Sequence, residues 1–216
     1  MVLRIAACTC GWFANLPSMR AAARSKAVRN QDEGRYAQAE ALDSQTLQIK
    51  RRVLGPEHPD TLETLSALAA MYQRQGKYTL AETYVAQTLA GRRHALGSEH
   101  PDTMASVADL ALAEVSEGRF AESEPLAREA LDTNSKIQPG NWQRFRAESL
   151  LGASLAGEKK YTQAEPMLLE GYQGMLARKD SMAVPDQYHF ELARGWLVTL
   201  YQDWGKPDKA AEWKKK

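Results

Sequence analysis

The chain has 216 residues, and its 28 lysines and arginines nearly balance its 27 aspartates and glutamates, which leaves a formal net charge of +1. Such a balance lacks the broad basic field that attracts nucleic acid or an acidic membrane, so we expect neither as a partner. No apolar run approaches the roughly 18 residues that a membrane-spanning helix needs. The only two cysteines, Cys8 and Cys10, provide no disulfide framework, which favours a reducing, cytoplasmic compartment.

A repeat of 42 residues dominates the sequence. LGPEHPDT at Leu54–Thr61 returns as LGSEHPDT at Leu96–Thr103, and 96 − 54 = 42. Self-similarity at a fixed period of this length is typical of a solenoid of stacked units. A second marker combines a glycine, a basic residue, an aromatic residue and a later glutamate. Its copies are GRYAQAE from Gly34, GKYTLAE from Gly76, GRFAESE from Gly118 and the weaker KKYTQAE from Lys159.

Each unit contains two runs of residues with helical periodicity. In the best-defined unit, Leu65 and Tyr72 belong to the apolar face of the first run, and Gly76 ends that run. Ala81 on the second run is small enough to lie between two antiparallel helices, and Glu82 is expected to face solvent. One helix pair cannot bury its own apolar face, so neighbouring pairs must stack on one another.

In chain order, the sequence predicts an array of helix pairs. Residues 1–16 are an uncertain segment, either the tail of a preceding repeat or disordered, and the apolar run before Cys8 is too short for an export signal. Residues 17–216 form the array, with units near 17–58, 59–100, 101–138, 139–183 and 184–216. Helices are expected at 18–31, 36–53, 60–75, 78–96, 102–117, 120–135, 142–157 and 161–178, then through Phe190, Leu197 and Tyr201, and in a short basic cap at the end.

This pattern resembles the tetratricopeptide repeat. The 42-residue period and the L-G-x-E-H-P-D-T signature are similar to kinesin light chains, and more so to bacterial kinesin-light-chain-like proteins, which often follow a serine/threonine protein kinase domain. The resemblance covers about residues 17–216 and implies an all-α fold, a right-handed α-solenoid of about five antiparallel helix pairs. The residues that follow the family's order of small and large side chains are Leu65, Leu68, Ala69, Tyr72, Gly76, Tyr78, Ala81 and Leu89.

No catalytic motif accompanies the repeats. The sequence contains no glycine-rich phosphate loop, no H-E-x-x-H or G-x-S-x-G, and no kinase H-R-D with D-F-G. We therefore expect no enzyme activity, no cofactor and no metal. His58 and His100 could bind a metal with the glutamates that precede them, but their spacing comes from the repeat itself, which favours helix capping. Asp60 and Glu63 also have the spacing of a capping box.

A binding site for a protein or peptide is expected on the concave face, which the first helix of each pair lines in such solenoids. The small residues along this face suit an extended or helical peptide with modest side chains. The groove residues that the resemblance implies are Arg24, Glu63, Ser66, Ala70, Gln73, Ala105, Ala108, Leu112, Arg146, Ser149 and Ala153.

Two functions fit these observations. The favoured one is a non-enzymatic protein–protein interaction module. The alternative, implied by the resemblance, is the C-terminal scaffold or sensor arm of a bacterial serine/threonine protein kinase whose catalytic domain lies outside this chain. Homotypic stacking of array ends is a third, weaker hypothesis. The tryptophans near the C-terminus are expected to close the last helix layers rather than to stack on a ligand; they are Trp142, Trp196, Trp204 and Trp213.

Overall fold

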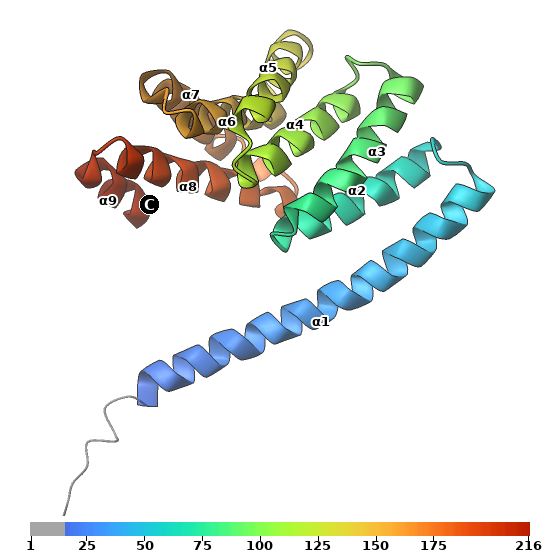
Figure 1. Ribbon diagram of the computed structural model, residues 1–216, viewed down its shortest axis with the longest axis horizontal. Coiled ribbons are helices and arrows are strands. Elements are labelled where there is room, and N and C mark those ends of the chain that lie inside the picture. Colours follow the sequence, from blue (N-terminus) through green and yellow to red (C-terminus); the bar gives the residue numbers. More distant parts are fainter. Residues whose placement is uncertain (1–15) are drawn as a thin grey trace, which may run out of the picture. The chain divides into compact units, whose positions relative to one another are not determined.

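The computed structural model describes the backbone of residues 16–216 and the side chains of residues 35–216 apart from Pro185. Over this part of the chain it contains nine α-helices, two short 3₁₀ helices and no strand (Figure 1), which confirms the all-α fold. None of the described helices is both long enough and apolar enough to cross a membrane. The elements are α1 (Leu16–Val53), α2 (Pro59–Arg74), α3 (Tyr78–Leu96), α4 (Pro101–Ser116), α5 (Phe120–Ile137), α6 (Trp142–Gly157), α7 (Tyr161–Leu176), η1 (Lys179–Ser181), η2 (Val184–Asp186), α8 (Tyr188–Asp203) and α9 (Pro207–Lys215).

The first helix differs from the prediction of two helices at 18–31 and 36–53, because α1 continues through Gly34. The equivalent Gly76 and Gly118 do end their helices, with φ angles of 71° and 76°. A single glycine costs a helix only about 1 kcal/mol, so it ends a helix only where a folded-back pair buries apolar surface. Residues 18–31 carry four basic residues and few large apolar ones, and so offer little surface for such a pair.

The contacts divide the chain into two units, Met1–Ser44 and Gln45–Lys216. The first contains most of α1, where Leu42 is exposed. The second contains the last turns of α1 and every later helix, and its first buried apolar side chain is Leu47. The stacked helix pairs therefore belong to the second unit.

Histidines of the repeat signature cap the first helices of the middle pairs. Nδ1 of His58 accepts a hydrogen bond from the backbone N–H of Asp60 at 3.2 Å, and His100 accepts one from Asp102 at 3.2 Å. This confirms the capping role predicted for the two histidines. The helices begin at the proline after each histidine, so the N-cap is the histidine, and a capping box formed by Asp60 and Glu63 was the wrong prediction.

A basic residue near the end of α1 and another near the end of α3 each bond to the first helix of the next pair. Nη1 of Arg92 donates to the carbonyl oxygen of Asp102 at 3.0 Å and to Oγ of Ser106 at 2.8 Å. Lys50, 42 residues earlier, makes the equivalent two bonds one unit earlier, at 3.0 and 2.9 Å. The sequence period thus repeats as a period of hydrogen bonds between stacked pairs.

The glutamate that ends the second marker pairs with a basic residue of the following unit. The sequence pattern predicted that Glu82 would face solvent. Instead, its side chain is half-buried and forms an ion pair with Arg119. The neighbouring Ala81 is completely buried, which confirms its predicted place. The three ion pairs of this ladder are Glu82 with Arg119 at 2.6 Å, Glu124 with Lys160 at 3.0 Å and Glu165 with Lys209 at 2.9 Å.

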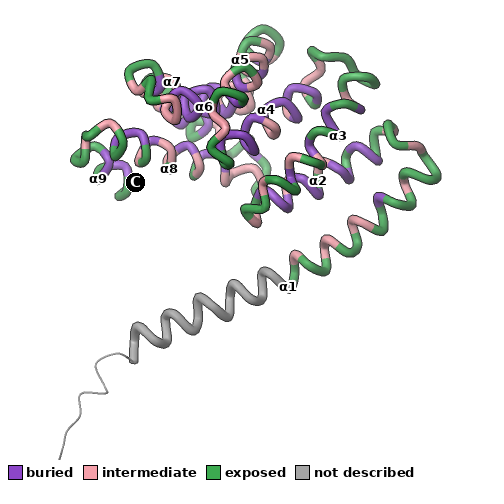
Figure 2. The backbone as a smooth tube through the Cα atoms, in the orientation of Figure 1, coloured by how far each residue is buried: buried purple, intermediate pink, exposed green. Residues whose placement is uncertain are grey.

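Burial is densest on α4 and α6, which appear largely purple in Figure 2. Glycines on α7 allow α6 to approach closely. A Cβ at Gly171 would lie 2.1 Å from Oγ of Ser149 and 2.7 Å from the carbonyl oxygen of Phe145. Any side chain at this position would displace the backbone of α6, so α6 and α7 form the tightest helix pair of the array.

Aromatic pairs close the C-terminal end. The ring of Trp213 on α9 meets Tyr172 of α7 edge-on at 5.0 Å between centroids, and Trp204 stacks on Tyr161 at 5.8 Å. Trp213 is buried. These contacts confirm the closing role predicted for the two tryptophans, and they fix the end of α8 against α7.

Candidate functional site

We call the surface formed by the first helices, α2, α4, α6 and α8, the inner face. Three predicted groove residues on it lie beneath the beginning of α8. The Tyr188 hydroxyl donates to Oε1 of Gln73 at 3.4 Å, although the two residues are 115 positions apart. Leu112 lines a small cavity of about 200 Å³ together with both residues, and Arg146 pairs with Asp109 at 2.5 Å. This part of the groove is covered by the chain itself.

The covered part is polar at its centre and poorly solvated. Burial raises the pKa of Asp186, and although Arg146 opposes this rise, nearby Asp109 adds to it. Burial also raises the pKa of Tyr188. Burial lowers the pKa of His189 well below its usual value, which keeps the ring neutral, and the ring stacks on Trp142 at 5.8 Å. The start of α8 is therefore held by a buried, uncharged aromatic contact as well as by polar groups.

Apart from Ala153, the remaining predicted groove residues divide into three sets. Glu63 is exposed, and Ser66, Ala70 and Ala105 are half-exposed, so these four still offer a surface. Ala108 is buried, and Ser149 lies against α7 rather than in a groove, because α6 is surrounded on several sides. Both were wrong as open groove positions. The side chain of Arg24 lies outside the described residues.

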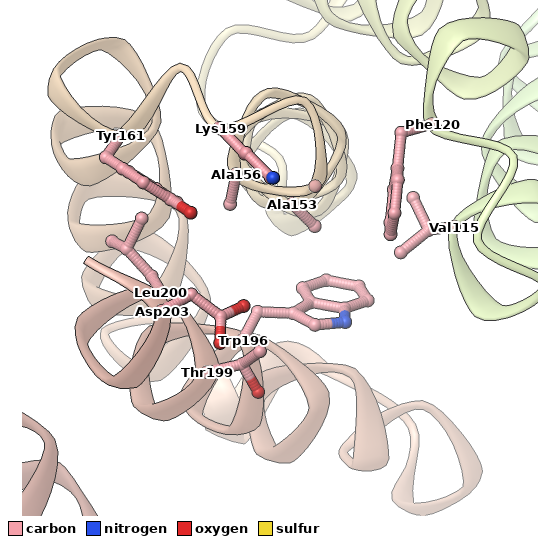
Figure 3. Close-up of a pocket in the computed structure, with 11 residues that line it drawn as sticks. Val115, Phe120, Ala153, Ala156, Lys159, Tyr161, Trp196, Thr199, Leu200 and Asp203 are labelled. Atoms are coloured by element: carbon pink, nitrogen blue, oxygen red, sulfur yellow. The ribbon is translucent and has the colours of Figure 1, made fainter. Parts of the chain in front are cut away.

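A larger cavity, of about 480 Å³, lies further along the inner face between the ends of α6 and α8. Figure 3 shows its walls: Phe120 and Val115 on one side, Trp196 on α8, and Tyr161 at the start of α7. Ala153, which the resemblance placed in the groove, lines it too. Pockets of this size and apolar character are common ligand sites in proteins.

Sequence reasoning missed this cavity, although one signal was available. Lys159 stands where the other units have the marker glycine, and it has a φ of 63°. A left-handed backbone is costly for a residue with a Cβ. Lys159 and Asp203 both line the cavity. Trp196 also lines it, so the prediction that this tryptophan only closes a helix layer was incomplete.

Histidine, cysteine and acidic side chains are the groups that could form a metal site or an acid–base site. Over the described residues, no three histidine, cysteine, aspartate or glutamate side chains gather closely enough to bind a metal ion. Cys8 and Cys10 lie outside those residues. Burial, opposed by Arg144 and assisted by Glu170, raises the pKa of the Glu148 carboxyl to about 7. Glu148 is buried between α6 and α7 and lines neither cavity.

Two overlapping segments of the chain, residues 19–93 and 63–136, match the tetratricopeptide repeat family. Together they span more than half of the 216 residues. The chain therefore belongs to the tetratricopeptide repeat family.

Solved structures with a similar fold are related to kinesin light chains. A candidate kinesin light chain with nearly identical TPR-like repeats from Podosopora anserina is 24% identical over 92% of this chain and 93% of that one, with a TM-score of 0.62. BtubC (BKLC) from P. vanneervenii is 20% identical over 85% of this chain and 72% of that one, also with a TM-score of 0.62. No curated protein matches the chain. Identities this low show a shared fold, while the predicted link to a protein kinase stays a prediction.

Proposed function

We propose that the chain is a non-enzymatic protein–protein interaction module that binds a polypeptide segment on its inner face. The observation that carries this proposal is that the start of α8 lies against residues of α2, α4 and α6. There a segment of the same chain, distant in sequence, already lies across Gln73, Leu112 and Arg146. Surfaces that hold one polypeptide segment through side-chain hydrogen bonds and apolar contacts are suited to hold another.

The open part of the inner face lies on α2 and the first half of α4. Ala70 and Ala105 are half-exposed there, and their small side chains leave room beside them for a peptide. Tetratricopeptide solenoids present this kind of extended surface to partners. A partner segment would therefore contact these first helices next to the covered part.

The test places bulk on this surface. Ala70→Trp combined with Ala105→Trp should reduce capture of partners from a bacterial lysate, because two indoles fill the space beside the helices. The matched control is Ala86→Trp with Ala121→Trp, which makes the same chemical change at exposed positions of the second helices α3 and α5. Ala108 is unsuitable, because it is buried and a tryptophan there would unfold the array.

The readout is quantitative mass spectrometry of captured proteins, with a melting curve for each variant. Loss of the same proteins in the inner-face variant alone supports the proposal. Equal capture by both variants, or loss only in the second-helix variant, contradicts the inner-face site. If the wild-type chain captures nothing above background, the interaction role itself fails.

A further inference from the structure

Lys159 adopts a backbone geometry that the other units assign to glycine. Its N–H donates to the carbonyl of Ala156 at 2.9 Å, as the N–H of Gly118 donates to Val115 at 3.1 Å. Gly76, Gly118 and Gly205 have φ angles of 71°, 76° and 72°, and Lys159 has 63°. A glycine would adopt the left-handed backbone of this turn without strain. A lysine at the same position makes the turn less stable.

The lysine stands at the cavity of about 480 Å³ between α6 and α8. Lys159 comes from the turn after α6, and Asp203 comes from the end of α8; Figure 3 shows the amine and the carboxylate on facing sides of the cavity. Among the described residues, neither Lys159 nor Asp203 forms an ion pair, whereas the adjacent Lys160 forms two. One cation and one anion thus remain available to a ligand.

Beside the two charges, the cavity is apolar and aromatic. Trp196 forms one wall and Phe120 another. The ring of Phe120 packs directly against the backbone of Gly157. A Cβ at Gly157 would lie only 2.3 Å from the ring, so a larger residue would displace it. A glycine at the last position of α6 lowers helix stability, and here it makes room for an aromatic wall.

We infer that this cavity binds a small zwitterion with an aromatic or large aliphatic side chain, the chemistry of a free α-amino acid. Lys159 binds the carboxylate, Asp203 binds the ammonium group, and the side chain lies between Trp196 and Phe120. A residue within a peptide has neither charge, and a residue at a peptide terminus has only one of the two. A free amino acid alone offers both charges beside one side chain. The site is separate from the interaction role and does not depend on it.

Calorimetric titration of the full chain with L-phenylalanine and L-leucine tests the inference. Both should show saturable binding at one site. N-acetyl-L-phenylalanine lacks the ammonium group and L-phenylalaninamide lacks the carboxylate, so each should bind about tenfold or more weakly, the usual loss when a charge-assisted hydrogen bond is removed. N-acetyl-L-phenylalaninamide, which represents a residue inside a peptide, should bind weakest.

Two substitutions separate binding from folding. Lys159→Gly restores the marker glycine, so it should melt no lower than wild type and yet bind L-phenylalanine about tenfold or more weakly. Asp203→Asn should weaken L-phenylalanine binding while leaving binding of N-acetyl-L-phenylalanine unchanged, because that probe has no ammonium group. Lys136→Gln and Asp132→Asn remove the same charges at exposed positions on α5 and should leave all affinities unchanged.

Three results would overturn the inference. The first is no binding of either amino acid to the folded chain. The second is equal affinity for the charged and capped phenylalanine probes, which would show that the cavity does not recognise the carboxylate and ammonium groups. The third is tightest binding of the doubly capped probe, which identifies the cavity as a peptide side-chain pocket. That last result would leave the proposed interaction role in place, and the lysate experiment judges that role separately.

Discussion

The middle repeats, residues 59–137, and the C-terminal region, residues 142–216, build the same fold in different ways. In the middle repeats, contacts recur 42 residues apart: the histidine caps and the bonds of Arg92 each have an earlier copy. In the C-terminal region the period breaks, Asn141 replaces the capping histidine, and the two 3₁₀ turns carry the chain back to Gln73. The repeated residues stabilise the stack, and the cavity beside Lys159 occurs where the repetition stops.

Not every departure from the repeat indicates a site. Asn141 still caps its helix, since its Oδ1 accepts a hydrogen bond from the N–H of Gln143 at 3.2 Å. The replacement of histidine by asparagine therefore preserves the helix cap. Lys159 keeps the backbone geometry of glycine at an energetic cost. A replacement that costs stability and lines a cavity is the more informative kind, and the predictions below probe this difference between the two regions.

The largest expected effect concerns the close approach of α6 and α7. Gly171→Ala should lower the free energy of unfolding by about 2–4 kcal/mol, since the added Cβ meets backbone atoms of α6 that cannot move aside. Those atoms are the carbonyl oxygen of Phe145 and the amide nitrogen of Ser149, each 2.7 Å from the added carbon. Chemical denaturation monitored by circular dichroism measures the change.

The matched substitution in the middle repeats is Gly91→Ala. There the added carbon meets only the flexible end of Leu62, and the gain in helix propensity of about 1 kcal/mol offsets the crowding. Gly91→Ala should therefore stay within about 1 kcal/mol of wild type. Equal losses at the two glycines would show that α6 and α7 pack no more tightly than α2 and α3.

The second prediction concerns pH. Glu148 has a pKa near 7 in the folded chain instead of 4.5, so the folded state holds its proton more tightly than the unfolded state. Its contribution to stability is fully present below about pH 4.5 and disappears as the pH rises through 7, for a loss of about 1–3 kcal/mol. His189 acts in the opposite direction, because burial lowers its pKa and stability is lost as the pH falls below its ordinary value of 6.5.

Glu148→Gln separates the two groups. The amide stays uncharged, so the variant should become more stable than wild type as the pH rises from about 5 to 7.5, leaving the opposing trend of His189 visible. Urea denaturation across this range measures it, with Glu63→Gln as an exposed control. A difference between variant and wild type that does not change with pH would contradict the burial assigned to Glu148.

The sequence predicted much of the structure of the middle repeats, because the signals that place each helix lie within that helix or directly beside it. A glycine, a proline after histidine and an apolar period place a helix within one or two residues, and α3 and α6 begin and end where predicted. The continuous α1 could not be predicted, because the marker at Gly34 looks like its copies. What differs is how much apolar surface a folded-back helix would bury, and that depends on neighbours in space rather than on the motif.

The candidate sites were harder to predict for a related reason. The inner-face positions followed from the family pattern, but the pattern could not show that Tyr188 would cover Gln73 from 115 positions away. The cavity beside Trp196 depends on where α8 lies relative to α6, which no local motif determines. Lys159 was visible as a substitution of a glycine, and its meaning became clear only with its φ angle and the cavity beside it.

The third prediction concerns the glutamate ladder. Glu82→Leu should lower the melting temperature slightly, since it removes one partner of Arg119, and the loss should shrink in high salt. Arg119→Met should cost more, because Arg119 also pairs with Glu114 and Glu117 and its loss leaves three carboxylates close together. Glu63→Leu serves as a control with an exposed side chain. Equal, salt-independent changes in all three variants would show that the ladder does not stabilise the stack.

The smallest effect expected is a reciprocal exchange between the two regions. Lys159→Gly should raise the free energy of unfolding by less than about 1 kcal/mol, because relief of the left-handed backbone slightly exceeds the entropy that a glycine adds to the unfolded chain. Gly118→Lys should lower it by about the same amount for the opposite reason. A Cβ at Gly118 meets nothing within 4 Å, so crowding does not confuse the comparison. Paired thermal melts at several denaturant concentrations resolve differences of this size. If Lys159→Gly is less stable than wild type, then the lysine contributes to the fold itself, and its place at the cavity needs no ligand to explain it.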